Sequence, residues 1–449
     1  MNVLTDIAFN CDWISAGQDV AELRETAAQF TLRVGDVSLT QNEDVWSKTV
    51  RNSVLVSAYP LAIWLAASWW RLNYEPLPKP GVSPSVDWRM VHEIGAANHG
   101  YVWPHVVMAP DGEAVQIWAA PSSPGGRQSV RYITGLHTPR SITAECFQGA
   151  VDAFIDMVLS RLNALGHSET NLASLWRLVQ EDRADPEMAR MRRIEAQMGY
   201  EPEECPNEVM VEVLKLEARM GAPTLSELTP VFGRRDGGAS LDEISRLAGG
   251  CGLEGKLQVP ATTLDAQSSA EPPWQRGVDA AKDLRLKLGN LRDPIDGDTL
   301  YGLLGLKTQT VEEWVPPSRH QVGLAVPTTE GGIKFIPRKR HPTAKRFEFS
   351  RLLGDHLNNR GASTCWLAST DLATSRQKFQ RAFSAEFLCP IDSLVGFLDM
   401  DFSESAVEEA ASYFGVSDQT VESLLANNGY IAPRVFKGWL PYSETHRIS

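Results

Sequence analysis

The sequence predicts an α+β protein of two main domains, and three observations support this prediction. Alternating strand patterns occur beside helical ones in the first part of the chain, and longer helical periodicities follow. A stretch rich in glycine, serine and proline at 232–272 separates this part from a second region with its own strands and helices. The length of 449 residues suits two to three domains.

The composition is that of an ordinary soluble globular protein, with 43% hydrophobic and 22% charged residues. The formal net charge of −13 disfavours non-specific attraction of the whole molecule to nucleic acid or anionic lipid. Six cysteines are scattered without a metal-binding or disulfide spacing, which is typical of free thiols in a reducing compartment. The first residues have no signal-peptide pattern, so we expect a cytoplasmic protein.

In the N-terminal region, residues 29–39 alternate as a strand does, and a long helix is expected from about Val45. Residues 52–70 form a 19-residue uncharged run, which is long enough to span a bilayer. Its polar residues and the absence of further membrane patterning favour a buried helix anchored by three tryptophans. Residues 105–108 and 114–119 flank a Pro-Asp-Gly turn and predict a hairpin.

From residue 141 to about residue 228 the pattern becomes helical. Apolar side chains recur at three- and four-residue spacing along the first helix and define one buried face. These residues are Val151, Phe154, Ile155, Val158 and Leu162. Further helices are expected at 172–179, 186–198 and 205–220.

The second region predicts two hairpin strands, two long helices and a helical end. Its expected elements are a helix at 274–288, strands at 322–326 and 333–336, a helix at 343–358, a strand at 365–368, a helix at 372–388, and helices at 403–414 and 417–426. The predicted organisation is an α+β domain of unknown type at 1–231, a connector with one short helix at 232–272, a second domain at 273–400, and a helical module with a tail at 401–449.

Two helical segments of the second region carry a family resemblance. Residues 346–357 read RFEFSRLLGDHL, and residues 383–390 read FSAEFLCP. These segments resemble the active-site helix and the second metal-site helix of the ImmA/IrrE-type metallopeptidases, found in stress regulators, mobile elements and toxin–antitoxin or phage-defence settings. The resemblance covers roughly residues 270–435 and implies a zincin-like domain followed by a helix-turn-helix-like module.

The resemblance implies a scaffold whose zinc site is degenerate. Peptidases of this class place two histidines at i and i+4 on one helix face, with a glutamate at i+1 as general base. Aligned on the Arg346-Phe347 pair and Gly354, the two histidine positions hold Arg351 and Asp355, and Leu352 takes the place of the glutamate. Arginine stays protonated and does not bind zinc, and leucine transfers no proton. No metal, cofactor or catalytic residue is therefore expected.

The replaced positions predict a binding site for an anionic ligand or a partner protein. Six residues are the candidate lining of this basic cleft: Arg346, Arg351, Asp355, His356, Arg376 and Arg381. Arg351 and Asp355 are spaced for an i,i+4 ion pair. The alternative interpretation is a solvated basic face with local ion pairs.

The chain end predicts a pair of helices of the helix-turn-helix kind. Ser417 is expected to cap the second helix, with Gln419 and Thr420 as its leading polar side chains, where DNA bases are usually contacted. Residues 401–437 carry six acids against two basic residues, and affinity for DNA depends on phosphate neutralisation. DNA binding is therefore the weaker interpretation, beside a structural or protein-contact role.

A third hypothesis assigns chemistry to the N-terminal domain. His92, Glu93 and His99 are a conceivable metal or catalytic set, although packed histidines are commoner than such sites. The preferred interpretation is a non-catalytic regulatory or sensor protein on a metal-free ImmA/IrrE-like scaffold, with no membrane association. The alternatives are a DNA-binding regulator and an enzyme acting through its N-terminal domain.

Overall fold

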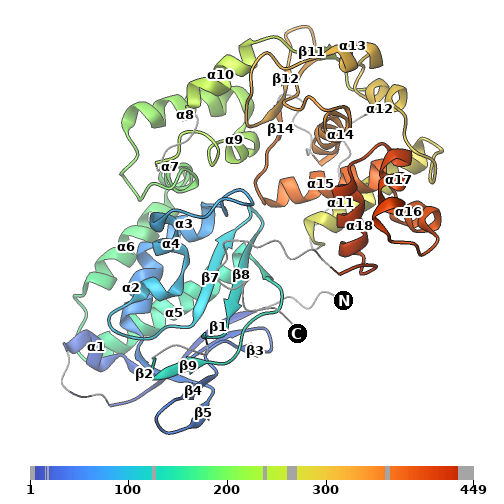
Figure 1. Ribbon diagram of the computed structural model, residues 1–449. Coiled ribbons are helices and arrows are strands. Elements are labelled where there is room, and N and C mark those ends of the chain that lie inside the picture. Colours follow the sequence, from blue (N-terminus) through green and yellow to red (C-terminus); the bar gives the residue numbers. More distant parts are fainter. Residues whose placement is uncertain are drawn as a thin grey trace. The chain divides into compact units, whose positions relative to one another are not determined.

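The computed structural model describes residues 6–15, 17, 20–123, 128–235, 240–259, 271–358 and 365–432. These residues form a mixed α/β protein of two compact units, coloured along the chain in Figure 1. The first unit consists of the chain up to Pro206, together with the separate residues Arg234 and Arg235. The second unit begins at Asn207 and contains most of the remaining chain.

The first unit combines small antiparallel sheets with helices. Its elements are β1 (Ile7–Trp13), α1 (Ala21–Glu25), β2 (Ala27–Val34), β3 (Val37–Ser38), β4 (Asn42–Asp44), β5 (Thr49–Arg51), β6 (Val54–Ser57), α2 (Tyr59–Ala67), α3 (Trp69–Tyr74), α4 (Val86–His92), η1 (Ile94–Ala97), β7 (His105–Pro110), β8 (Ala114–Ala120), β9 (Val130–Tyr132), β10 (Arg140–Thr143), α5 (Ala144–Ala164), α6 (Asn171–Ala184) and α7 (Pro186–Gln197).

Three antiparallel sheets belong to this unit, and those that contain β1 and β8 pack against α5. The strand orders are β1-β2-β3 with β6 also on β2, β10-β8-β7, and β5-β4-β9. Figure 1 shows α2, α5 and α6 lying beside one another, and these helices are in contact. The predicted apolar face of α5 is confirmed, because all five of its residues are buried. The predicted hairpin is confirmed as β7 and β8.

The helix expected from Val45 is wrong. The segment instead forms a tight turn followed by β5 and β6. In this turn Asp44, the last residue of β4, accepts hydrogen bonds from the backbone N–H groups of Trp46 and Ser47. Such Asx turns compete with helix formation. The uncharged run ends in two short helices, α2 and α3, whose tryptophans are buried as expected. In the part of the chain that is described, no helix has the length and apolarity needed to cross a membrane.

The second unit is mainly helical, with one four-stranded sheet. Its elements are α8 (Asn207–Met220), α9 (Ala222–Leu228), α10 (Leu241–Gly249), β11 (Leu253–Gly255), α11 (Pro273–Lys287), α12 (Gly297–Leu303), α13 (Thr308–Glu313), β12 (Gly323–Pro327), β13 (Ile333–Ile336), α14 (Pro342–Asn358), β14 (Leu367–Ser369), α15 (Ser375–Leu388), α16 (Ile391–Leu398), α17 (Glu404–Phe414) and α18 (Asp418–Asn427).

The core of this unit is a helical layer centred on α15. The antiparallel sheet has the order β11-β13-β12-β14, and α14 packs against both β14 and α15. Helix α11 lies along α15, and a Cβ atom on Gly277 would come within 2.5 Å of the Phe379 carbonyl oxygen. A Cβ on Gly354 would come within 2.6 Å of the Phe383 ring. Glycine at these two positions therefore allows α11 and α14 to approach α15 closely.

The division between the units differs from the predicted domain limits. The first unit ends at Pro206, whereas the predicted first domain runs to residue 231, and α8 and α9 belong to the second unit. The predicted connector contributes α10, close to the short helix expected there, and β11, which pairs with β13. The structure thus places α10 and β11 of the connector in the second unit, whereas Arg234 and Arg235 group with the first unit.

Candidate functional site

The candidate site lies where α14, α15 and β14 meet, with α9 beside β14. Polar side chains are unusually buried here, although such groups are stable in a protein interior only when they are hydrogen-bonded or paired. The buried polar residues of this region are Glu227, Glu348, Ser350, Arg351, Asp355, Ser369, Thr370, Thr374, Gln377, Gln380 and Ser384.

A buried ion pair joins the two long helices. Arg376 on α15 contacts both carboxylate oxygens of Asp355 on α14, with Nε–Oδ1 at 2.7 Å and Nη2–Oδ2 at 2.6 Å. Asp355 also accepts a hydrogen bond from the backbone N–H of Ala368 at 3.0 Å, and Arg376 donates to the Pro223 carbonyl at 2.8 Å. This fork geometry fixes α14, α15, β14 and α9 relative to one another.

The expected i,i+4 pair between Arg351 and Asp355 is therefore wrong. Asp355 turns toward Arg376, and Arg351 donates through Nη2 to the Thr370 carbonyl at 2.6 Å and to the side-chain oxygen of Gln377. The Nε atom of Arg351 is buried and has no hydrogen-bond partner. Burial and, to a smaller extent, the charges of Arg381 and Arg338 lower the pKa of Arg351 to about 9.

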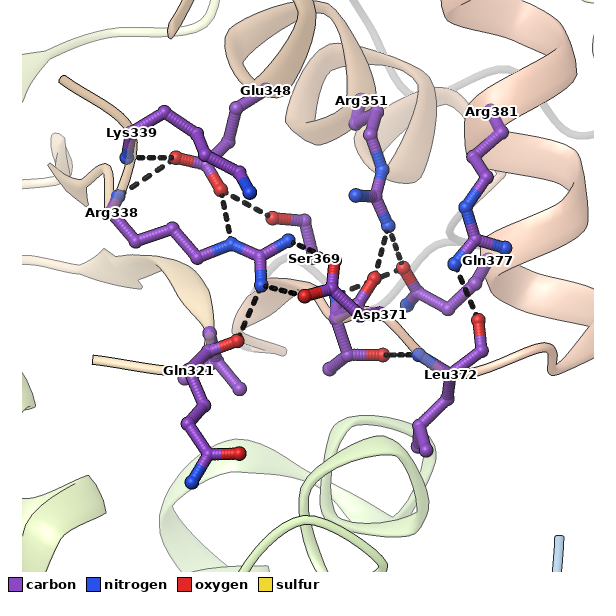
Figure 2. A network of polar contacts seen from close by, with 12 residues as sticks. Gln321, Arg338, Lys339, Glu348, Arg351, Ser369, Asp371, Leu372, Gln377 and Arg381 are labelled. Atoms are coloured by element: carbon purple, nitrogen blue, oxygen red, sulfur yellow. Dashed lines mark hydrogen bonds and ion pairs between the residues drawn. The ribbon is translucent and has the colours of Figure 1, made fainter. Parts of the chain in front are cut away.

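Arg381 approaches the same region from the next turn of α15. Figure 2 shows Arg351 and Arg381 extending side by side toward the segment of Asp371 and Leu372. Arg381 donates to the Leu372 carbonyl at 2.5 Å, and burial lowers the pKa of its half-buried guanidinium. Neither Arg351 nor Arg381 forms an ion pair with a carboxylate in the described part of the chain.

Arg338 holds the carboxylates that face these two cations. It contacts Asp371 through Nη1 at 2.9 Å and Nη2 at 2.8 Å, and Glu348 through Nε at 2.7 Å (Figure 2). Glu348 also accepts hydrogen bonds from the backbone N–H groups of Arg338 and Lys339. Asp371 is 55% exposed, and Arg338 holds its pKa below the usual value against the effect of burial. Asp371 therefore lies at the solvent edge of the site.

Glu227 completes the network from a distant part of the sequence. Its carboxylate accepts the Thr374 hydroxyl at 2.8 and 2.9 Å and the Gln377 side-chain amide at 3.0 Å. Burial raises the pKa of Glu227, and the nearby Arg376 charge opposes that effect. Sequence reasoning missed Glu227 because no local motif marks a residue on the short helix α9 as a partner of α15.

The structure brings together four of the six predicted cleft residues. Arg351, Asp355, Arg376 and Arg381 belong to the network, whereas the other two predicted residues contact carbonyls elsewhere. Arg346 donates to the Ile295 carbonyl, and His356 contacts the Val259 carbonyl at 2.7 Å through Nε2.

The residues at the aligned zinc positions do not fit a zinc site. Arg351 is a cation, Leu352 is a buried aliphatic residue, and both carboxylate oxygens of Asp355 contact Arg376. Within the described ranges, no group of three or more histidine, cysteine or acidic side chains is placed to hold a metal ion.

The predicted helix pair at the chain end is present as α17 and α18. Gly415, at a φ of 64°, ends α17, and the Ser417 hydroxyl accepts a hydrogen bond from the Thr420 N–H at 3.2 Å. The hydroxyl groups of Ser417 and Thr420 also lie 2.9 Å apart, so both side chains take part in the helix cap. Gln419 is exposed on the first turn of α18. Two helices joined by a tight turn are therefore present, and a helix-turn-helix module and DNA binding by it stay predictions.

Two of the three N-terminal candidates, His92 and Glu93, contact residues outside the predicted set. His92 is fully buried, with Nδ1 2.7 Å from the Met108 carbonyl and Nε2 3.2 Å from a carboxylate oxygen of Glu75. Glu93 pairs with Arg89 at 2.7 Å, and His99 lies on an exposed loop. The geometry of His92 is that of a packed core histidine.

Comparisons with family models, curated proteins and solved structures found no match to this chain. The resemblance to ImmA/IrrE-type peptidases therefore stays a prediction that rests on the two sequence segments. The site is an ion-paired helix junction beside Arg351 and Arg381, which have no carboxylate partner among the described residues.

Proposed function

We propose that this protein acts by binding, as a non-catalytic regulatory or sensor protein on a metal-free scaffold similar to ImmA/IrrE-type peptidases. The ion pair between Asp355 and Arg376 supports this proposal, because it joins the two helices that a zinc ion would join in such a peptidase. A regulatory role in a mobile-element, toxin–antitoxin or phage-defence setting follows from the resemblance. A cytoplasmic location fits the six free cysteines.

The ligand that the site favours is an anion, and one observation carries this part of the proposal. Arg351 and Arg381 bring two guanidinium groups to the same segment, and neither has a carboxylate partner in the described residues. A buried charge without a partner is unfavourable, so the binding of an anion is more favourable here than at a solvated surface. The unpartnered Nε of Arg351 supplies a donor for such an anion.

Asp371 is the residue of this chain that competes with the proposed ligand. Its carboxylate lies near Arg351 and Arg381 while it is held by Arg338. Removal of the Asp371 charge takes away a negative charge that offsets the positive charges of Arg351 and Arg381. We therefore expect the Asp371→Asn variant to bind anions more tightly than the unaltered protein does.

Calorimetric titration with phosphate, sulfate and acetate tests this function. The unaltered protein is expected to bind at least one of these anions, and Arg381→Gln to weaken that binding at least tenfold. Lys378→Gln is the matched control, because it removes one positive charge one turn away on the same helix. Equal affinities of the two variants would place the anion elsewhere. The absence of binding by Asp371→Asn as well as by the unaltered protein would overturn the proposal.

A second candidate is a DNA-binding regulator, and the α17–α18 pair favours it. Gln419 stands exposed at the start of the second helix, where a recognition helix contacts base edges. Electrophoretic mobility shifts with duplex DNA at several salt concentrations test this function. Binding that falls with salt and is lost in Gln419→Ala would support it.

A further inference from the structure

The C-terminal helices of the second unit expose a cluster of large apolar side chains. Phe397 is 37% exposed, Met400 69% and Tyr413 50%. The rings of Phe397 and Tyr413 stack with centroids 4.7 Å apart, so the end of α16 and the end of α17 contribute to one surface. Tyr413 in turn meets the buried Phe414 edge-on at 4.9 Å. We call Phe397, Met400 and Tyr413 the aromatic patch.

The backbone beside the patch is held in an unusual conformation. Asp399 and Met400 both have positive φ, at 44° and 67°, although neither is glycine. Each such residue costs free energy, on the order of 1 kcal/mol, and persists only where its surroundings impose it. The Asp401 N–H donates to the Leu398 carbonyl at 2.8 Å, and the Asp401 carboxylate accepts the Ser403 N–H at 2.9 Å. Met400 lies at this corner with 69% of its surface exposed.

The chain segment that carries the patch is acidic. Residues 391–432 contain no lysine or arginine. The same residues carry eight acids, which are Asp392, Asp399, Asp401, Glu404, Glu408, Glu409, Asp418 and Glu422. Glu409 precedes Tyr413 by one helical turn and is exposed on the same face of α17.

We propose that the aromatic patch binds a basic amphipathic segment of a partner protein. Leucine-like side chains at helical spacing would cover Phe397, Met400 and Tyr413, while lysine or arginine on the flanks of that segment meets the surrounding carboxylates. Charge selects this occupant. The phosphates of a nucleic acid are repelled by eight acids, and a second copy of this surface repels itself.

This inference does not depend on the proposed anion site, since the two involve different residues and opposite charge. The probe is a fluorescent 18-residue peptide of leucine and lysine with helical spacing. A peptide with glutamate for lysine and an oligolysine of equal charge are its controls. Fluorescence anisotropy with the full chain is expected to show saturable binding of the leucine–lysine peptide only.

Two double variants locate the binding. Met400→Ser/Tyr413→Ser removes apolar surface from side chains that are at least half exposed, and Glu408→Lys/Glu409→Lys reverses two charges. Each is expected to weaken peptide binding at least tenfold with an unchanged circular dichroism spectrum. The matched controls are Trp46→Ser, at an exposed tryptophan of the first unit, and Glu169→Lys/Glu181→Lys on that unit's surface. Both controls are expected to bind normally.

Three results would overturn the proposal. The first is equal weakening in the patch variants and the controls, since binding would then follow the net charge of the molecule. The second is oligolysine binding as tightly as the amphipathic peptide, because the apolar side chains would then contribute nothing. The third is no saturable binding of the leucine–lysine peptide by the unaltered protein.

Discussion

Replacement of Arg376 by methionine tests whether the ion pair between α14 and α15 holds the second unit together. The side chains of Arg376 and Asp355 are 14% and 2% exposed, so solvent screens the pair little. Removal of one partner from a buried pair costs about 3–5 kcal/mol, because the other charge stays buried without compensation. In Arg376→Met, Asp355 keeps only its hydrogen bond from the Ala368 N–H.

The double variant Arg376→Met/Asp355→Leu separates the charge effect from packing. It removes both charges of the pair, and its main loss is the acceptor of the Ala368 N–H, which costs about 1–3 kcal/mol. The double variant is therefore expected to be more stable than the single variant by about 2 kcal/mol. A double variant that is more stable than the single variant indicates a buried ion pair. If the two side chains acted independently, their stability losses would add and the double variant would be the less stable one.

Hydrogen exchange measured by mass spectrometry is the suitable assay, because two units can unfold separately. Peptides from residues 342–358 and 375–388 report on the two helices. A loss of about 3–5 kcal/mol accelerates their slowest exchange by a factor between about 10² and 10⁴. Arg51→Met, which breaks an exposed pair at 3.9 Å, is the control and should leave these peptides unchanged. A cost below about 1 kcal/mol for Arg376→Met would refute the reasoning.

Three further predictions concern packing, protonation and thiol chemistry. Gly354→Ala is expected to destabilise the second unit by about 1–3 kcal/mol, because the added methyl group would meet the Phe383 ring of α15. Gly149→Ala is the control and should stabilise its helix, because no atom lies within 4 Å of the added methyl group. Urea unfolding measures both stabilities, and a Gly354→Ala variant as stable as Gly149→Ala would contradict the described packing. Burial raises the pKa of Glu227 above 4.5, so the folded state retains that proton longer than the unfolded chain, and stability falls as pH rises from 4.5 through the folded pKa. Glu227→Gln cannot ionise, so the stability difference between this variant and the unaltered protein should shift in favour of the variant as pH rises over that range. A stability difference that does not change with pH would contradict the raised pKa of Glu227. Iodoacetamide should modify the exposed Cys251 and leave the buried Cys389 unmodified, because burial raises the pKa of the Cys389 thiol to about 12. Mass spectrometry of the native protein identifies the modified cysteine, and modification of Cys389 alone would contradict the burial of that thiol.

Helices with strong local signals could be predicted from the sequence. The apolar spacing along α5 depends only on residues within one helix, and the structure buries that face. Ser417 has the side chain and the position of a helix cap, and it caps α18. The hairpin of β7 and β8 was also predictable, since its Pro-Asp-Gly turn lies between two apolar strands.

Short strands and the polar network depend on distant residues, and no local pattern reveals them. Strand β4 has only three residues and pairs with β9, which lies far along the chain. The carboxylate of Glu227 meets Thr374 across 147 positions of sequence. The two long helices and the residues Arg351, Asp355, Arg376 and Arg381 were predictable, but the partner of Asp355 was not. Spacing along one helix identifies Arg351 as a possible partner, and only the packing of α14 against α15 selects Arg376.

The pairing of β11 with β13 determines where this protein can be cut. A shortened chain that begins at residue 273 keeps both long helices but lacks β11, so β13 becomes an open sheet edge that is available to other molecules. The same cut removes Glu227, which accepts hydrogen bonds from the Thr374 hydroxyl and from the Gln377 side-chain amide. Expression of the second unit alone should therefore begin near Asn207, and a chain that begins at residue 273 is expected to aggregate.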